Sequence, residues 1–240
     1  MGDNMLKIKN FSKTYSKNKV KAVEGLNLEV KKGEIYGFIG HNGAGKTTTI
    51  KAITGIIDFE EGDILVNNIS IKKSPIECKK NIAYIPDNPD IYLSFTGISY
   101  LNFIADIFNL DEKTRNEKIK YYSSKFEMSN KLGDLISTYS HGMKQKLVII
   151  SSLIHDPKLL ILDEPFTGLD PKSSYILKDI IRDLCKNGGS VFFSSHVLEV
   201  VEKFCDKVGI IKDGKLIRSI DLKNEKDTKN LEALFLELNE

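Results

Sequence analysis

A glycine-rich segment at residues 40–47, GHNGAGKT, constrains the fold of this chain more than any other feature of its sequence. It follows a short apolar run at 35–39 and opens a helical pattern from Lys46 to about Thr54. Glycines let the backbone curl until its N–H groups face phosphate oxygens, and the dipole of the following helix adds to the attraction. The plainer alternative is a glycine turn that only caps a helix. A strand, this loop and a helix in succession predict a phosphate-binding loop.

Two side chains of the loop suit a nucleotide with its cation. Lys46 can reach the β- and γ-phosphates as a mobile positive charge, and Thr47 can offer its hydroxyl to Mg²⁺. We therefore expect a nucleotide and Mg²⁺ as ligands. The residues expected to line the nucleotide along this segment are Gly40, His41, Asn42, Gly43, Ala44, Gly45, Lys46, Thr47 and Thr48.

The composition excludes several other classes of protein. The chain has 240 residues, of which 41% are hydrophobic and 28% charged, as in ordinary globular domains. Basic and acidic residues nearly balance at 35 and 33, and only Arg115, Arg182 and Arg218 are arginines. This preference for lysine over arginine disfavours a protein that recognises nucleic acid through arginines, so no nucleic-acid partner is expected. The three cysteines show no C-x-x-C spacing, and we expect buried, reduced thiols.

Apolar runs in the sequence are short. Residues 1–7 contain none, so no signal peptide is expected, and the uninterrupted aliphatic stretches at 147–150 and 159–162 are four residues long. A membrane-spanning helix needs about 20 apolar residues. We therefore expect that the chain does not cross a membrane by itself.

Strand and helix patterns alternate along most of the chain, which predicts an α/β fold with a mostly parallel sheet. We expect one domain over 1–240, in which 5–86 and 157–220 form a phosphate-binding α/β core with an N-terminal antiparallel β subdomain. Residues 87–156 form an inserted α-helical subdomain, and 221–240 a tail with a helix at 230–238. Strands are expected at 5–15, 20–30, 35–39, 82–85, 159–162, 190–194, 207–211 and 215–220, and helices at 97–110, 111–128, 141–155, 172–186 and 197–204.

A pair of carboxylates follows the apolar run 159–162. A nucleotide site with a phosphate-binding loop needs an acidic residue at the end of a second buried strand to hold Mg²⁺, and Asp163 stands there. Glu164 follows and points elsewhere because strand residues alternate between faces, so it can polarise the water that attacks the γ-phosphate. The alternative is a solvated acidic turn stopped by Pro165.

Further motifs occur in a specific order around these residues. The run Tyr139-Ser140-His141-Gly142-Met143 precedes a helix, Gly168-Leu169-Asp170 follows Glu164, and Ser194-Ser195-His196 ends a strand. With the phosphate loop, these motifs resemble the nucleotide-binding subunit of ABC transporters over nearly the whole chain. The resemblance implies that the nucleotide is ATP and that the protein is an ATPase.

The resemblance also implies roles for single residues. Tyr15 would stack on the adenine and His196 would bond the γ-phosphate, although alone they are an ordinary strand aromatic and an ordinary histidine. Ser140 and Gly142 would contact the γ-phosphate held by a second subunit, whereas a serine there is more commonly a helix cap. Asp170 would lie across the same interface.

The sequence departs from the family pattern at two places. Tyr139, His141 and Met143 replace the usual leucine, glycine and glutamine of the signature loop, a variation similar to that of the drug, bacitracin and ABC-2 type export branches. Asp87 stands where the family usually has glutamine, so we expect it to be a Mg²⁺ ligand with Thr47 and Asp163. Its neighbour Asn88 is the alternative.

The resemblance implies two kinds of protein partner. One is a second copy or a paralogous ATPase subunit, which joins in an ATP-dependent dimer. The other is a separate transmembrane permease subunit, expected to dock on 87–110 and to hold this protein at the cytoplasmic face of the membrane. We expect the dimer to drive transport, in the export direction. The alternatives are a buried role for 87–110 and a soluble ABC ATPase of cofactor assembly or another non-transport process.

Overall fold

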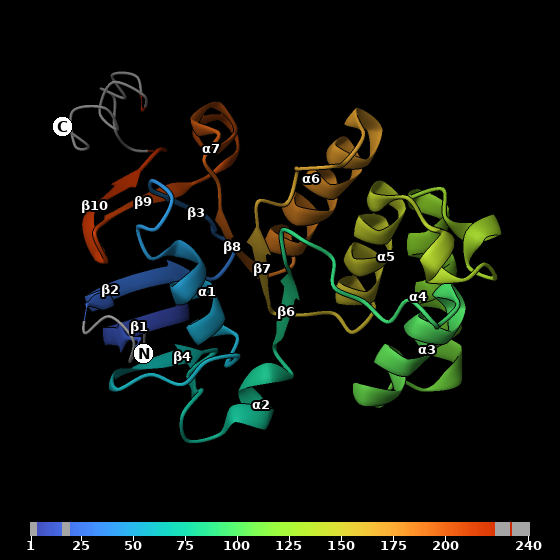
Figure 1. Ribbon diagram of the computed structural model, residues 1–240, viewed down its shortest axis with the longest axis horizontal. Coiled ribbons are helices and arrows are strands. Elements are labelled where there is room, and N and C mark those ends of the chain that lie inside the picture. Colours follow the sequence, from blue (N-terminus) through green and yellow to red (C-terminus); the bar gives the residue numbers. More distant parts are fainter. Residues whose placement is uncertain (1–3, 16–19, 224–230, 232–240) are drawn as a thin grey trace.

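Two sheets organise the molecule, and the computed structural model describes residues 4–15, 20–223 and 231 (Figure 1). The first sheet has the order β2-β1-β4-β5, and its neighbouring strands are antiparallel. Its strands are β1 (Asn4–Thr14), β2 (Lys21–Lys31), β4 (Glu61–Val66) and β5 (Ile69–Ser70). The second sheet has the order β10-β9-β3-β8-β7-β6, and β10 alone among its strands pairs antiparallel to its neighbour. Its strands are β3 (Ile35–Ile39), β6 (Ile82–Ile85), β7 (Leu159–Asp163), β8 (Ser190–Ser194), β9 (Lys207–Lys212) and β10 (Lys215–Asp221).

Both faces of the parallel strands are covered, which explains why their sequences are continuously apolar. Every residue of β3, β7 and β8 is buried. Alternate residues enter different cores: Leu160 and Leu162 join one hydrophobic cluster, and Leu159 and Ile161 join the other. Each of these side chains contributes about 1.5–3 kcal/mol by leaving water. The position of β7 in the sheet is therefore strongly fixed.

Helices surround the second sheet and extend beyond its β6 edge (Figure 1). Helix α3 (Gly97–Ile107), α4 (Glu112–Lys125) and α5 (His141–Leu153) form the group on the β6 side, and α6 (Pro171–Lys186) lies between that group and β7. The other α-helices are α1 (Lys46–Ile53), α2 (Pro75–Lys79) and α7 (Leu198–Phe204), and two 3₁₀ helices lie at Ser129–Lys131 and Ile136–Thr138. The predicted α/β fold with its antiparallel N-terminal sheet is confirmed.

Two regions of the sequence-based prediction need comment. The sequence pattern assigned no element to residues 55–81, where the structure has β4, β5 and α2. In β4 a glycine interrupts the pattern of strand residues. Gly62 has φ of 82°, and a Cβ at this position would lie 2.3 Å from the carbonyl oxygen of Asn10, so the structure requires glycine there. The helix expected at 230–238 lies outside the described residues, apart from Leu231, which is helical.

Candidate nucleotide site

The phosphate-binding loop connects β3 to α1, and close backbone packing requires its glycines. A Cβ at Gly40 would lie 2.4 Å from the carbonyl oxygen of Ile211, and one at Gly45 would lie 2.7 Å from that of Ala22. Gly45 also has φ of 112° and caps the N-terminus of α1. Such a conformation and such contacts exclude L-residues with side chains. The loop is therefore wedged between β9 and the start of β2, with its shape fixed by the surrounding strands.

The Lys46 side chain lies inside this loop and is only 9% exposed. Its ammonium group donates hydrogen bonds to the carbonyl oxygens of Gly40, at 2.6 Å, and His41, at 3.1 Å. Burial lowers the pKa of Lys46, and the nearby charges of Glu164 and Asp163 oppose that shift. The loop thus holds a positive charge at its centre, the place where a phosphate-binding lysine is needed. Thr47 is exposed and Thr48 half-buried at the start of α1.

The two carboxylates at the end of β7 are held by the neighbouring strand β8. Asp163 pairs with Ser194 in the parallel register, and the Ser194 hydroxyl donates to its carboxylate at 2.5 Å. The backbone of Glu164 has φ of 49°, which turns the chain out of the strand. One oxygen of Glu164 accepts a hydrogen bond from the Ser195 hydroxyl at 3.4 Å, and the other lies 2.8 Å from Nδ1 of His196. Asp163 is therefore oriented by the last residue of β8, and Glu164 by the two residues that follow that strand.

The catalytic candidates and the phosphate loop meet in one hollow of about 510 Å³. Glu164, His196 and Asp87 all line it, together with the start of the phosphate loop. The side chain of His196 is 65% exposed and that of Glu164 is 17% exposed, so solvent reaches the pair from the histidine side. A half-buried carboxylate beside a solvent-exposed imidazole can accept a proton from a water molecule held in the hollow.

Oxygen donors of the type that Mg²⁺ prefers occur on segments that border the same hollow. Asp87 lines it with a carboxylate, the Thr47 hydroxyl follows Lys46 at the start of α1, and the Asp163 carboxylate precedes Glu164 at the end of β7. Hard oxygen ligands of this kind fit Mg²⁺, which keeps several of its own waters when few protein ligands are present. Among the described residues, no group of three or more His, Cys, Asp and Glu side chains is arranged as a metal site. The donor set fits a cation that nucleotide phosphates help to hold.

Other predicted residues lie apart from this hollow. Ser140 caps α5, and its hydroxyl accepts a hydrogen bond from the backbone N–H of Met143 at 3.3 Å. Gly142 packs against Gly168, because a Cβ on Gly142 would lie 3.3 Å from the Gly168 carbonyl oxygen. Asp170 caps α6. The N-termini of α5 and α6 thus form a second unit, separate from the phosphate loop of the same chain.

An ion pair joins these two helix ends, and sequence reasoning did not find it. The Lys146 ammonium lies 2.8 Å from the Asp170 carboxylate, which also accepts hydrogen bonds from the backbone N–H and the hydroxyl of Ser173. These contacts hold the pKa of Asp170 well below its usual range. Ser194 and Ser195 were likewise missed as orienting residues. Their only sequence signal was their place immediately before His196.

Tyr15 immediately follows β1 and is 44% exposed. The Lys13 ammonium is 5.7 Å from the centre of that ring. The next residues, 16–19, lie outside the described part of the chain. Tyr15 is therefore accessible from solvent.

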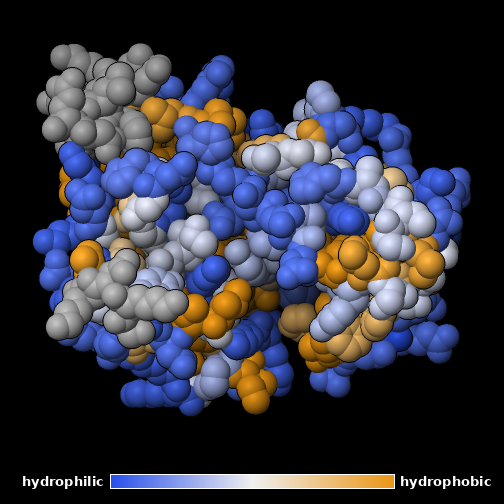
Figure 2. All heavy atoms as spheres, in the orientation of Figure 1, coloured by the Kyte–Doolittle hydropathy of each residue, from blue (hydrophilic) through white to orange (hydrophobic). Residues whose placement is uncertain are grey.

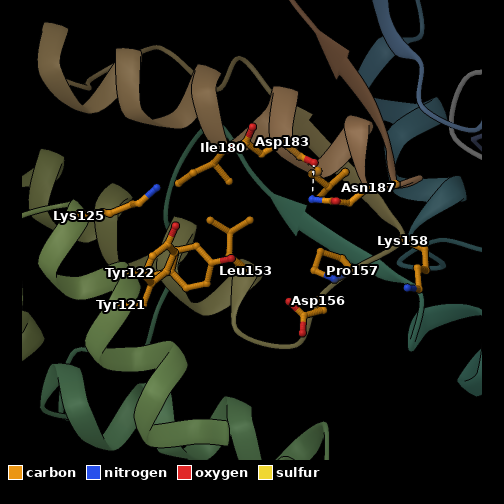
Figure 3. A pocket seen from close by; sticks show the side chains of 12 residues that line it. Tyr121, Tyr122, Lys125, Leu153, Asp156, Pro157, Lys158, Ile180, Asp183 and Asn187 are labelled. Atoms are coloured by element: carbon orange, nitrogen blue, oxygen red, sulfur yellow. Dashed lines mark hydrogen bonds between the residues drawn. The ribbon is translucent and has the colours of Figure 1, made fainter.

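A second groove, away from the phosphate loop, lies between α4, the loop from α5 to β7, and the end of α6 (Figure 3). Tyr121 and Tyr122 line one wall, and Asp183 and Asn187 line the opposite one (Figure 3). The groove contains both acidic and basic side chains, so its charge favours no class of ligand. It separates part of α4 from α6.

These observations first define the class of the protein. It has a P-loop ATPase core, with two carboxylates at the end of β7. The model of the ABC transporter family matches residues 23–167. This chain belongs to the ABC transporter family, as an ATP-binding subunit with ATPase activity. Within the described part of the chain, no helix is both long and apolar enough to cross a membrane.

Two relatives and one solved structure illustrate the similarity. The bacitracin transport ATP-binding protein BcrA of Bacillus licheniformis is 36% identical over 217 residues, covering 90% of this chain and 69% of that protein. The linearmycin resistance ATP-binding protein LnrL of Bacillus subtilis (strain 168) is 34% identical over 213 residues, covering 89% and 68%. A solved ATP-binding subunit of an ABC transporter superimposes with a TM-score of 0.92 at 29% identity, covering 98% of this chain and all of that one (100%).

Proposed function

We propose that this protein dimerises around two Mg-ATP and that the cycle of ATP binding and hydrolysis drives a separate membrane subunit to export a substrate. The observation that carries the proposal is the division of the site into two units. Glu164 and His196 line one hollow with the start of the phosphate loop, whose carbonyl oxygens bond Lys46, whereas Ser140 and Gly142 lie at the start of α5. A second copy can bring its Ser140 to the phosphates bound at this Lys46, and such a dimer contains two complete sites.

Within each site, the residues divide the chemistry of phosphate transfer to water. We assign to Lys46 the binding of the β- and γ-phosphates, to Glu164 the acceptance of a proton from the attacking water, and to His196 a hydrogen bond to the γ-phosphate. Support for the assignment of Glu164 comes from its contacts with Ser195 and His196, which hold the carboxylate at the hollow. Mg²⁺, when bound with ATP, neutralises phosphate charge, and Thr47 and Asp163 are its proposed protein-side ligands.

The oligomeric state provides the test of this proposal. Because ATP itself completes the interface, a Glu164→Gln chain, which is expected not to consume its ATP, is expected to be monomeric alone and dimeric with Mg-ATP. Light scattering measures the mass in each condition, and Mg-ADP, which lacks the γ-phosphate, serves as the control. A mass that stays constant with and without Mg-ATP would contradict the proposed function.

We propose Asp87 as the residue that takes the place of the family's glutamine. Asp87 lines the hollow with Glu164, and Asn88 is not among the lining residues. An aspartate adds a negative charge near Asp163 and the phosphates, which is unfavourable until a divalent cation arrives. We therefore expect Asp87→Gln to make ATP affinity depend less steeply on Mg²⁺ concentration. Binding titrations at several Mg²⁺ concentrations measure this, with Asn88→Ala as the matched variant. An unchanged dependence in Asp87→Gln, with a weaker one in Asn88→Ala, would assign the role to Asn88.

Segment 87–110 is our proposed docking surface for the membrane subunit. Apolar side chains gather over the α3 side of the molecule (Figure 2). Tyr92 is 58% exposed, Ile107 56% and Phe103 38%, and the rings of Tyr92, Phe95 and Phe103 pack together with centroids 5.3–6.0 Å apart. A contiguous exposed apolar patch of this kind is typical of an interaction site.

Charged substitutions on this surface are expected to uncouple transport from hydrolysis. Because Phe103 and Ile107 are both exposed, Phe103→Asp and Ile107→Lys should fold and keep the ATPase activity of the isolated chain. Transport in cells that contain the membrane subunit should be lost. Ile76→Lys, at a 72% exposed position on α2, is the matched control and should leave transport unchanged. Unfolding of the docking variants, measured by thermal melting, would favour a buried role for the segment.

The relatives support export as the direction. BcrA is a bacitracin transport ATP-binding protein and LnrL a linearmycin resistance ATP-binding protein. The signature loop of this chain also has the Tyr139, His141 and Met143 variation. The protein is then held at the cytoplasmic face of the membrane through its partner.

A further inference from the structure

Two segments distant in the sequence, 93–98 and 132–137, lie side by side and are joined backbone to backbone. The first leads into α3, and the second precedes the signature residues at the start of α5. Thr96 and Leu135 form an antiparallel bridge. Four hydrogen bonds connect the segments: Gly97 N–H to Asp134 at 3.2 Å, Ile98 N–H to Leu132 at 2.8 Å, Ile136 N–H to Phe95 at 2.9 Å and Ser137 N–H to Leu93 at 3.1 Å. The backbone entering α3 therefore cannot shift without moving the backbone before α5.

Tyr139 reinforces this connection with its side chain. The ring is only 5% exposed, and its hydroxyl donates a hydrogen bond to the carbonyl oxygen of Lys131. The same hydroxyl lies against Gly97, the first residue of α3, where a Cβ would be 2.4 Å from it. The φ of Gly97 lies outside the left-handed region, so space rather than backbone conformation requires glycine there. The tyrosine hydroxyl and the missing Cβ therefore fit together as a pair.

The position of Tyr139 in the chain connects this fit to both proposed surfaces. It immediately precedes Ser140, which caps α5 and is proposed to meet the ATP bound at Lys46 of a second copy. At the other end, Phe95 belongs to the ring cluster of the proposed docking surface. A leucine, the usual family residue at this position, has no hydrogen-bond donor in its side chain.

We infer that Tyr139 is a positioning residue, which fixes Ser140 relative to α3 through its hydroxyl, its bond to Lys131 and its fit against Gly97. The docking surface and the signature loop then move as one body. The inference rests on the proposed function, because it assumes that Ser140 meets ATP held by a second copy.

The first test removes the hydroxyl alone. In the Glu164→Gln chain, Tyr139→Phe should leave ATP affinity at Lys46 unchanged and weaken ATP-dependent dimerisation about three- to tenfold. That factor corresponds to the net contribution of one hydrogen bond. Tyr36→Phe is the matched control, since Tyr36 is 1% exposed and its hydroxyl is 3.0 Å from that of Ser219, far from α5. A merely structural role for Tyr139 would lower the melting temperature in both variants and leave dimerisation unchanged in both.

The second test uses the steric fit. Gly97→Ala should weaken dimerisation at least as much as Tyr139→Phe, because its Cβ meets the hydroxyl. Adding Tyr139→Phe to Gly97→Ala removes that atom and leaves the added Cβ with its 3.2 Å contact to the Cα of Leu132, so the double variant should dimerise better than Gly97→Ala alone. Additive losses in the double variant, or equal dimerisation of parent and Tyr139→Phe, would overturn the inference. A parent chain that does not dimerise with ATP would instead contradict the proposed function.

Discussion

Replacing Glu164 with glutamine is expected to slow ATP hydrolysis by roughly 10²–10⁴-fold, the contribution of a positioned general base. Glutamine keeps the shape of the side chain and can still bond Ser195 and His196, but it has no charge with which to take a proton from water. ATP affinity should therefore survive. Phosphate release measures the rate, and nucleotide titration measures the affinity.

The control for this prediction is another glutamate of the same region. Glu199 lies on α7 and pairs with Lys203 at 2.7 Å on the exposed surface. Glu199→Gln changes the net charge of the protein equally but should leave the hydrolysis rate unchanged. Turnover at the wild-type rate by Glu164→Gln would show that another group accepts the proton.

Removing the ammonium group of Lys46 is expected to weaken ATP binding roughly ten- to hundredfold. Hydrogen bonds to charged groups contribute about 1.5–3 kcal/mol each, and 1.4 kcal/mol is a factor of ten in affinity. In Lys46→Ala the carbonyl oxygens of Gly40 and His41 also lose their donor, so the loop is less well ordered. Lys51→Ala, in the last turn of the same helix, is the control with equal loss of charge. Equal affinities of the two variants would exclude Lys46 as a phosphate ligand.

The sequence predicted the elements whose pattern is strong over their own length. The glycine loop, the apolar runs of β3, β7 and β8, and the periodic helices were all found because burial on both faces or on one stripe leaves a clear pattern. The region 55–81 was missed because β4 begins around Gly62, and β5 has only two residues. A two-residue strand such as β5 acquires its structure from pairing with a neighbour, which a local pattern does not contain.

The site divides in the same way. Lys46 and the two carboxylates at the end of β7 could be predicted because they belong to continuous motifs. The pairing of Lys146 with Asp170, and the fit of Tyr139 against Gly97, join residues that are distant in the sequence. No spacing rule connects them, because only the packing of helices decides which side chains meet.

The register in which β7 pairs with β8 determines both the stability of the fold and the position of the proposed catalytic residues. Asp163 faces Ser194 in the ladder, and Glu164 reaches Ser195 one step further along. A slip by one residue would break both partnerships together. It would also turn Leu160 and Leu162 toward the wrong core, since each step along a strand changes faces. A molecule with the wrong register is therefore destabilised, and the molecules that fold share one geometry of the proposed catalytic residues.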